Sequence, residues 1–226
     1  MAINTKDVQT GGGVSKTLQP GNRLVKVTSL YLEKFPFKDD AYHLVIEGEG
    51  PAMGGDFEGF FIDKDDESKG RHAGQVGRIK ASEWAYADAT IPGGTEIKRD
   101  DEMVKFLKNL CDATGASAWF ISEDGKHDTI EALVHKMNTD KPFADKFMQC
   151  CLAGREYENK GGYLNYDLYF PKFTRTGIPF AAETNDAANI IQYNPDTHIK
   201  RKQIKEVDSF GGDTSDASAD FEMPAE

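Results

Sequence analysis

The first third of the chain alternates apolar and polar residues in short segments separated by turn residues. Four segments have this period of two, which is typical of half-buried β-strands: residues 22–37, 41–49, 57–64 and 75–88. Pro36 ends the first segment, and Pro51 begins a glycine-containing turn after the second. Strands joined in succession by short connections are typical of an antiparallel meander. This part of the chain therefore predicts a small barrel or a sandwich.

The period changes between residues 100 and 140. Residues 100–114 place apolar side chains three and four positions apart, which predicts a helix that ends at Gly115. A second helix is predicted to start at a capping box formed by Asp128 and Glu131. Residues 119–121 form a short apolar patch between the two helices. These patterns predict a helical insert at about residues 96–140 in a strand-rich chain.

Residues 146–173 predict a β-hairpin whose turn is Asn159-Lys160-Gly161-Gly162, because glycine and asparagine tolerate the positive φ of such turns. Alternation gives the hairpin one apolar face and a second face that carries Arg155, Tyr157, Lys160, Tyr163 and Tyr169. Aromatic rings beside cations can stack nucleobases and neutralise phosphates. A sandwich strand with tyrosine hydroxyls in water explains the same pattern, and both interpretations stay open. A short strand at 178–182 and an edge strand from residue 190 are predicted to follow.

The charge is divided unevenly along the chain. The 226 residues include 27 Lys and Arg and 38 Asp and Glu, a net charge of -11, which at first argues against nucleic acid. Residues 206–226 hold seven of the acids and no Lys or Arg, which leaves 27 basic against 31 acidic residues in the body. A basic block at residues 198–205 precedes this acidic tail. A tail that only improves solubility is the alternative interpretation.

The sequence predicts an intracellular protein without metal or cofactor. It has three cysteines, no signal peptide and no apolar run of membrane-spanning length, so no contact with a membrane is predicted. Cys150 and Cys151 are neighbours on a predicted strand and point to opposite faces, so they cannot both coordinate the same metal ion. Glu158-x-Lys160 resembles the acid and lysine of metal-dependent nucleases, but it falls on the hairpin turn without an evident acidic partner.

Basic and aromatic residues recur together on consecutive predicted strands, as nucleic-acid binding requires. Core packing is the alternative for single rings such as Trp84, whereas buried charges would need partners. The predicted nucleic-acid-binding residues are Lys34, Phe60, Arg71, Arg78, Lys80, Trp84, Tyr86, Arg155, Tyr157, Lys160, Tyr163 and Tyr169.

Three segments carry a family likeness: residues 54–63 (GGDFEGFFID), 74–78 (GQVGR) and 154–163 (GREYENKGGY). They resemble single-stranded DNA-binding proteins of crAss-like tailed phages, over about residues 20–182. The resemblance implies an oligonucleotide-binding (OB) barrel that coats single strands during phage replication. It also implies an acidic tail that recruits polymerase and helicase or primase and competes with DNA for the barrel. Such tails often end in an aromatic residue, whereas here five residues follow Phe221.

The combined expectation is a mainly β chain with a helical insert (α+β), built as an OB-like antiparallel β-barrel. Its expected parts are a flexible arm at residues 1–20, the barrel at 21–205 and a disordered acidic tail at 206–226. The expected function is non-catalytic binding of single-stranded DNA in phage replication and recombination, in the host cytoplasm, with homo-oligomers allowed. The alternatives are a metal-dependent nuclease or recombination enzyme using Glu158 and Lys160, and a phage structural or assembly protein.

Overall fold

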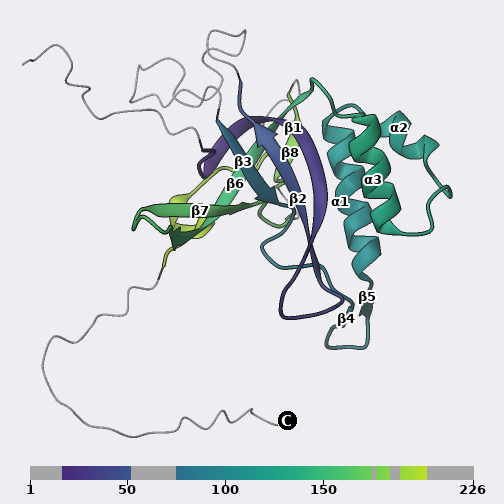
Figure 1. The fold of residues 1–226 in the computed structure, drawn as a ribbon, viewed down its shortest axis with the longest axis horizontal. Helices are drawn as coiled ribbons and strands as arrows, with labels where there is room; N and C mark the ends of the chain where they lie inside the picture. Colours follow the sequence, from purple (N-terminus) through teal and green to yellow (C-terminus); the bar gives the residue numbers. More distant parts are fainter. Residues whose placement is uncertain (1–16, 52–74, 175–176, 184–188, 203–226) are drawn as a thin grey trace, which may run out of the picture.

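The computed structural model describes residues 17–51, 75–174, 177–183 and 189–202 (Figure 1). Its strands are β1 (Gly21–Lys34), β2 (Tyr42–Glu49), β3 (Val76–Lys80), β4 (Ala89–Thr90), β5 (Glu96–Ile97), β6 (Phe147–Glu158), β7 (Leu164–Tyr169), β8 (Phe180–Ala182) and β9 (Ile199–Lys200). Its helices are α1 (Arg99–Ala113), α2 (Ser117–Ser122), α3 (Ile130–Asp140) and α4 (Pro195–His198). None of these helices is long and apolar enough to cross a bilayer.

Five strands of the described chain close into a barrel in the order β1-β2-β3-β7-β6, with β6 returning to β1. The closure depends on the length of β1: its first half pairs with β6 from Gly21 to Lys26, and its second half pairs with β2 from Lys26 onward. A register shift between Val27 and Ser29 marks the change of partner, where an irregularity increases the bend of the strand. Only β3 and β7 run parallel in this circuit. The predicted OB-like barrel with helices before β6 is confirmed.

Residues 17–20, which the sequence assigned to a flexible arm, lie against the barrel. The Leu18 amide donates to the Val76 carbonyl at 3.0 Å, and its side chain is buried in the core. Gly48 and Gly77 face each other across β2 and β3. A Cβ at Gly77 would lie 2.9 Å from the Leu18 Cβ, so the glycine leaves the space that Leu18 fills.

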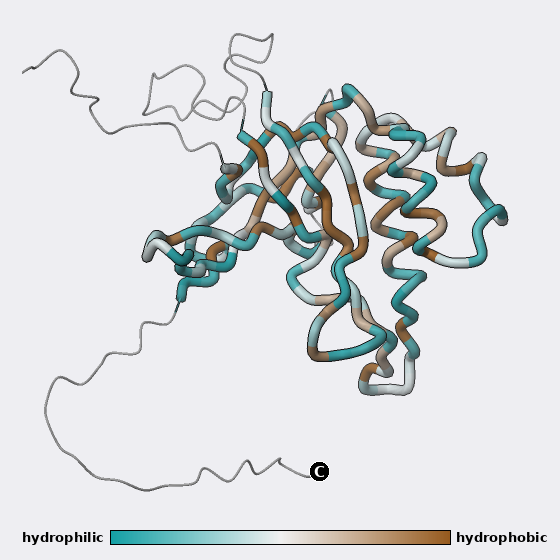
Figure 2. The backbone as a smooth tube through the Cα atoms, viewed as in Figure 1, coloured by the Kyte–Doolittle hydropathy of each residue, from teal (hydrophilic) through white to brown (hydrophobic). Residues whose placement is uncertain are grey.

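The helical insert packs on the barrel by its apolar stripe. The buried residues of α1 are Met103, Phe106, Leu107, Leu110, Cys111 and Ala113, and Gly115 follows the helix with φ +71°. Phe106 contacts Phe170 and Phe180, at 5.9 and 5.4 Å between ring centres, which ties α1 to the strand region. Figure 2 shows hydrophobic positions recurring along both the barrel strands and the helices. Insert and barrel therefore share one core.

Several expected elements differ in detail. The strand expected at 75–88 ends at Lys80, and the apolar patch at residues 119–121 lies in α2. The second helix begins one residue later than the capping box implies, because Thr129 is the N-cap and its hydroxyl accepts from the Ala132 amide at 3.2 Å. The segment after residue 190 forms α4 before β9. The expected strand at 57–64 lies outside the described residues.

Candidate nucleic-acid interface

A groove of about 400 Å³ opens where β3 and β7 separate. These two parallel strands share only the pairs Ile79 with Leu168 and Lys80 with Tyr169, so the barrel wall is incomplete beyond them. Side chains from five strands line the gap: Glu33, Val45, Arg78, Lys80, Tyr157, Asn165 and Asp167. The groove thus brings together three of the predicted binding residues, namely Arg78, Lys80 and Tyr157.

Arg78 is held in place by two residues of β1. Its Nε donates to the Tyr31 hydroxyl at 2.7 Å, and its Nη2 lies 3.1 Å from the Glu33 carboxylate. The guanidinium carbon also lies 5.7 Å from the centre of the Tyr31 ring. Lys80, two residues along β3, lies 3.7 Å from the Asp167 carboxylate on β7. Both cations therefore point to the outer face of the barrel and not into the core.

Trp84 forms the centre of a second cluster next to this groove. Its side chain is 60% exposed, in the segment that follows β3. The Arg155 guanidinium lies 5.6 Å and the Lys200 ammonium 5.7 Å from the centre of the indole ring. Arg155 and Lys200 are brought side by side because they are register partners on the parallel strands β6 and β9. An exposed indole with two cations over it offers both a stacking surface and charge for a phosphate.

Glu83 positions both cations of the Trp84 cluster. One oxygen of its carboxylate accepts from Arg155 Nη2 at 2.9 Å and also from the Lys200 ammonium. Burial by itself would raise the pKa of Glu83, but the hydrogen bonds from Lys200 and Arg155 outweigh burial and lower the pKa. Glu83 is therefore ionised at neutral pH and holds the two cations together.

The tip of the β6–β7 hairpin extends this surface. Tyr163 is 74% exposed, Tyr157 is 39% exposed, and Lys160 is exposed in the turn. The predicted turn is confirmed: the Asn159 side-chain oxygen accepts from the Gly161 and Tyr163 amides at 2.9 and 3.0 Å, and Gly162 has φ +79°. This local network fixes the path of the chain at the tip and leaves the tyrosine rings to solvent.

Two predicted stacking residues are turned away from solvent. Tyr169 is only 7% exposed and has a pKa raised by burial, with Glu83 and Arg155 near it. Tyr86 packs against the core and exchanges backbone hydrogen bonds with Tyr42, and burial raises its pKa as well. Neither ring therefore offers an open face on which a base can stack. Alternation along a predicted strand indicates which residues point outward, but it does not show which of them the rest of the chain covers.

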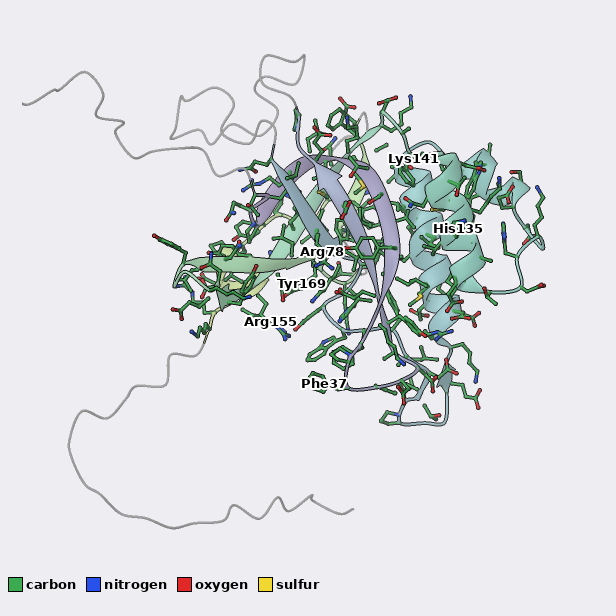
Figure 3. All side chains as sticks on the ribbon, in the orientation of Figure 1. Phe37, Arg78, His135, Lys141, Arg155 and Tyr169 are labelled. Carbon is green, nitrogen blue, oxygen red and sulfur yellow. The ribbon has the colours of Figure 1, made fainter. Side chains whose placement is uncertain are left out.

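The remaining predicted residues do not join the two clusters. Lys34 lies at the end of β1, where it pairs with Asp39 at 3.0 Å. Phe60 and Arg71 lie outside the described residues. Figure 3 shows Arg78, Tyr169 and Arg155 near one another on the strand side, with His135 and Lys141 on the helical insert. We call the Arg78–Lys80 groove and the Trp84 cluster together the strand face.

Carboxylates accompany the cations of the strand face. Glu33 pairs with Arg78, Asp167 with Lys80, and Glu83 with both Arg155 and Lys200. The pairs of Arg78 with Glu33 and of Lys80 with Asp167 lie at the surface, where such pairs are worth about 0–1 kcal/mol each, so an incoming phosphate can replace these two carboxylates. The Glu83 side chain, in contrast, is only 16% exposed and pairs with two cations. Lys160 makes no ion pair with any residue that the structure describes. The strand face is therefore preorganised for anions but is not strongly positive.

Sequence reasoning missed Tyr31, Glu33, Glu83 and Lys200. Tyr31 and Glu33 belong to β1, which reaches Arg78 only across β2, and no local pattern indicates such a contact. Lys200 was visible as part of the basic block at 198–205, but its place beside Arg155 follows from the parallel pairing of β9 with β6. Nothing in the residues around Glu83 distinguishes it from an ordinary surface acid.

The pair considered for nuclease chemistry is arranged differently from a metal site. The Glu158 carboxylate lies 2.5 Å from the Lys202 ammonium, which lowers the pKa of Glu158, and the Glu156 carboxylate accepts from the Lys202 amide at 3.2 Å. Within the described ranges, no three His, Cys, Asp or Glu side chains are grouped closely enough to share an ion. Glu158 thus serves to hold the chain that follows β9 against the hairpin.

Comparisons with protein-family models, with curated proteins and with solved structures found no match to this chain.

Proposed function

We propose that this chain binds single-stranded DNA without catalysing a reaction, and that it coats and protects the strand during phage replication and recombination in the host cytoplasm. The observation that carries the proposal is the exposed indole of Trp84 with Arg155 and Lys200 over its ring, next to the Arg78–Lys80 groove. Unpaired bases expose their π-faces, whereas a duplex stacks them internally. A surface that combines open rings and cations favours single strands.

Binding exchanges ion pairs on the strand face. Phosphates take the positions of the Glu33 and Asp167 carboxylates beside Arg78 and Lys80. They also contact the exposed parts of Arg155 and Lys200, while Glu83 still pairs with both. Each phosphate neutralised by Lys or Arg releases counterions from the DNA, which supplies the favourable free energy. Trp84, Tyr157 and Tyr163 receive bases, and stacking on them does not depend on sequence.

In this proposal the acidic residues 206–226 compete with DNA for the strand face and also bind replication proteins. The described chain ends at Lys202, which is held to the β6–β7 hairpin by Glu158. Glu206 follows four residues later, so it lies within about 14 Å of Lys202 at full extension. The length of chain therefore allows these seven carboxylates to reach the proposed DNA site.

A titration tests the binding itself. The full chain is expected to bind fluorescent poly-dT more tightly than duplex DNA of the same length, with RNA as the third arm, at two salt concentrations. A plot of the logarithm of the affinity against the logarithm of the salt concentration should have a slope of about −0.7 for each phosphate neutralised. Changing Arg155→Gln should reduce that slope by about 0.7, whereas Lys136→Gln on the helical insert should leave it unchanged. Equal affinity for duplex and single strands contradicts the proposal.

Deleting residues 206–226 tests the tail. The truncated chain is expected to bind poly-dT more tightly than the full chain, with the difference shrinking as salt rises, because screening weakens the competing carboxylates. The matched control keeps the tail at full length with its seven acids changed to Asn or Gln, and it should match the truncation. Unchanged or weaker binding after truncation removes the competitor role.

A further inference from the structure

A second groove, of about 470 Å³, opens on the helical insert. Its lining comes from α1, from α2, from the loop that joins α2 to α3 and from the first turn of α3. In Figure 1 the insert and the β6–β7 hairpin lie at opposite sides of the molecule. This groove is therefore separate from the strand face, and both surfaces are open at the same time in the part of the chain that the structure describes.

The floor of this groove is apolar. Val104 of α1 is 39% exposed and Ile121 of α2 is 71% exposed, while Phe120 and Leu133 are half-buried beside them. Apolar side chains on two neighbouring helices that remain open to water favour contact with a further apolar surface. A helix with one apolar face along its length is an element that packs into an apolar groove of this kind.

Polar contacts hold the groove in its open shape. The Trp119 indole nitrogen donates to the Asp140 carboxylate at 2.9 Å, which ties α2 to α3. The Glu123 carboxylate contacts His127 at 2.8 Å and Lys126 at 3.2 Å, which fixes the loop between these helices. A docking segment therefore meets a preformed surface and loses less free energy in ordering it.

The rim of the groove is acidic. Residues 99–140 contain nine Asp and Glu against five Lys and Arg. Asp124 and Asp128 line the groove, are exposed, and make no ion pair with any described residue. On the strand face, in contrast, Arg78, Lys80, Arg155 and Lys200 each have a carboxylate partner. Unpaired acids around an apolar floor favour a positively charged occupant.

The charge also excludes the other segments of this chain. Residues 52–74 carry six acids and three Lys or Arg, and residues 206–226 carry seven acids and no Lys or Arg. A second copy of the insert would bring its own acids against this rim. Residues 1–16 hold three consecutive glycines, which oppose a docked helix. These segments lack the positive charge or the helix propensity that the rim and the groove favour, which points to an occupant from another protein.

We propose that the insert groove binds a basic amphipathic helix of a partner protein, with apolar residues against Val104 and Ile121 and lysines or arginines against Asp124 and Asp128. The proposal does not depend on DNA binding by the strand face. It gives the helical insert a role of its own, as a protein-docking surface separate from the Arg78–Lys80 groove of the barrel.

A synthetic peptide tests this docking. The probe is a helical peptide of about 18 residues with Leu at helical spacing and Lys elsewhere, and its matched partner replaces each Lys with Glu. Fluorescence anisotropy with the full chain should give saturable binding of the Lys peptide only. Ile121→Ser should weaken that binding about tenfold, as the loss of one buried aliphatic anchor does. Asp124→Lys with Asp128→Lys should weaken it at least as much and reduce its salt dependence.

The control is Phe37→Ser, which removes a side chain that is 87% exposed in the β1–β2 loop and should leave the affinity for the peptide unchanged. Ile121, Asp124 and Asp128 are exposed, so their variants should fold, and circular dichroism checks this. Three results would overturn the proposal: no binding of the Lys peptide, equal binding by the Ile121 variant, or amide shifts in an NMR titration that fall on the barrel strands.

Discussion

Replacing Trp84 with alanine is expected to weaken the binding of single-stranded DNA by about 5- to 150-fold. The range follows from the roughly 1–3 kcal/mol that one base gains by stacking on an aromatic ring. Trp84 is the most favourable ring of the strand face, because it is 60% exposed and has Arg155 and Lys200 beside it. Its removal takes away both the stacking surface and the cation–π contacts that orient these two side chains. Fluorescence anisotropy with labelled poly-dT measures the effect.

Trp84→Phe is the matched control, since it keeps a ring at the same position and should recover most of the affinity. The exposure of Trp84 also implies that Trp84→Ala changes the free energy of unfolding little, about 0.5 kcal/mol. A thermal melt of both variants separates lost binding from lost folding. If Trp84→Ala binds poly-dT as tightly as the unchanged chain while folding normally, Trp84 is not part of a DNA site.

Replacing Phe170 with alanine is expected to lower the free energy of unfolding by about 3–5 kcal/mol. Phe170 is 2% exposed and directly follows β7. Its ring lies 5.9 Å from that of Phe106 on α1 and 5.0 Å from that of Phe180 on β8. The cavity would thus open where the insert, the barrel and β8 meet. Since whole domains are stable by only about 5–15 kcal/mol, the loss is a large part of the total.

Urea denaturation measures this loss from the shift of the midpoint at constant slope. Phe37→Ala serves as the control, because the Phe37 side chain is 87% exposed, and its effect should stay within about 0.5 kcal/mol. In a Trp84→Phe background, tryptophan fluorescence reports only on Trp119 in the insert, whereas circular dichroism reports on the strands as well; the two signals should give the same midpoint. Separate midpoints would show that the insert unfolds independently of the barrel, contrary to the shared core.

The paired charges of the strand face bear on how DNA would be released. Since Arg78, Lys80, Arg155 and Lys200 each have a carboxylate within reach, they are not left unpaired when DNA leaves. Unpaired cations would instead hold the strand more tightly at low salt. Under the proposed function, paired cations on the strand face therefore favour exchange of DNA over permanent attachment.

The sequence by itself determined the main elements of this protein, because they depend on local periodicity. The apolar stripe from Met103 to Cys111 predicted α1 within one residue at each end, and Gly115 marked its end. The asparagine and glycines at 159–162 predicted the β6–β7 turn through the backbone conformations that they tolerate. Short apolar runs such as 119–121 were ambiguous, because three residues do not distinguish a strand from a helical turn.

Only the tertiary structure decided the site. Alternation assigned Tyr157, Tyr163 and Tyr169 to one face, but the barrel buries Tyr169 and leaves the other two exposed. The partners of the cations come from strands far apart in the chain, as with Glu33 and Arg78 or Glu83 and Lys200. Such pairs depend on strand order and register, which are set by the closure of the whole barrel. A local pattern shows which side of a strand a residue occupies, whereas its neighbours in space are fixed only when β6 meets β1.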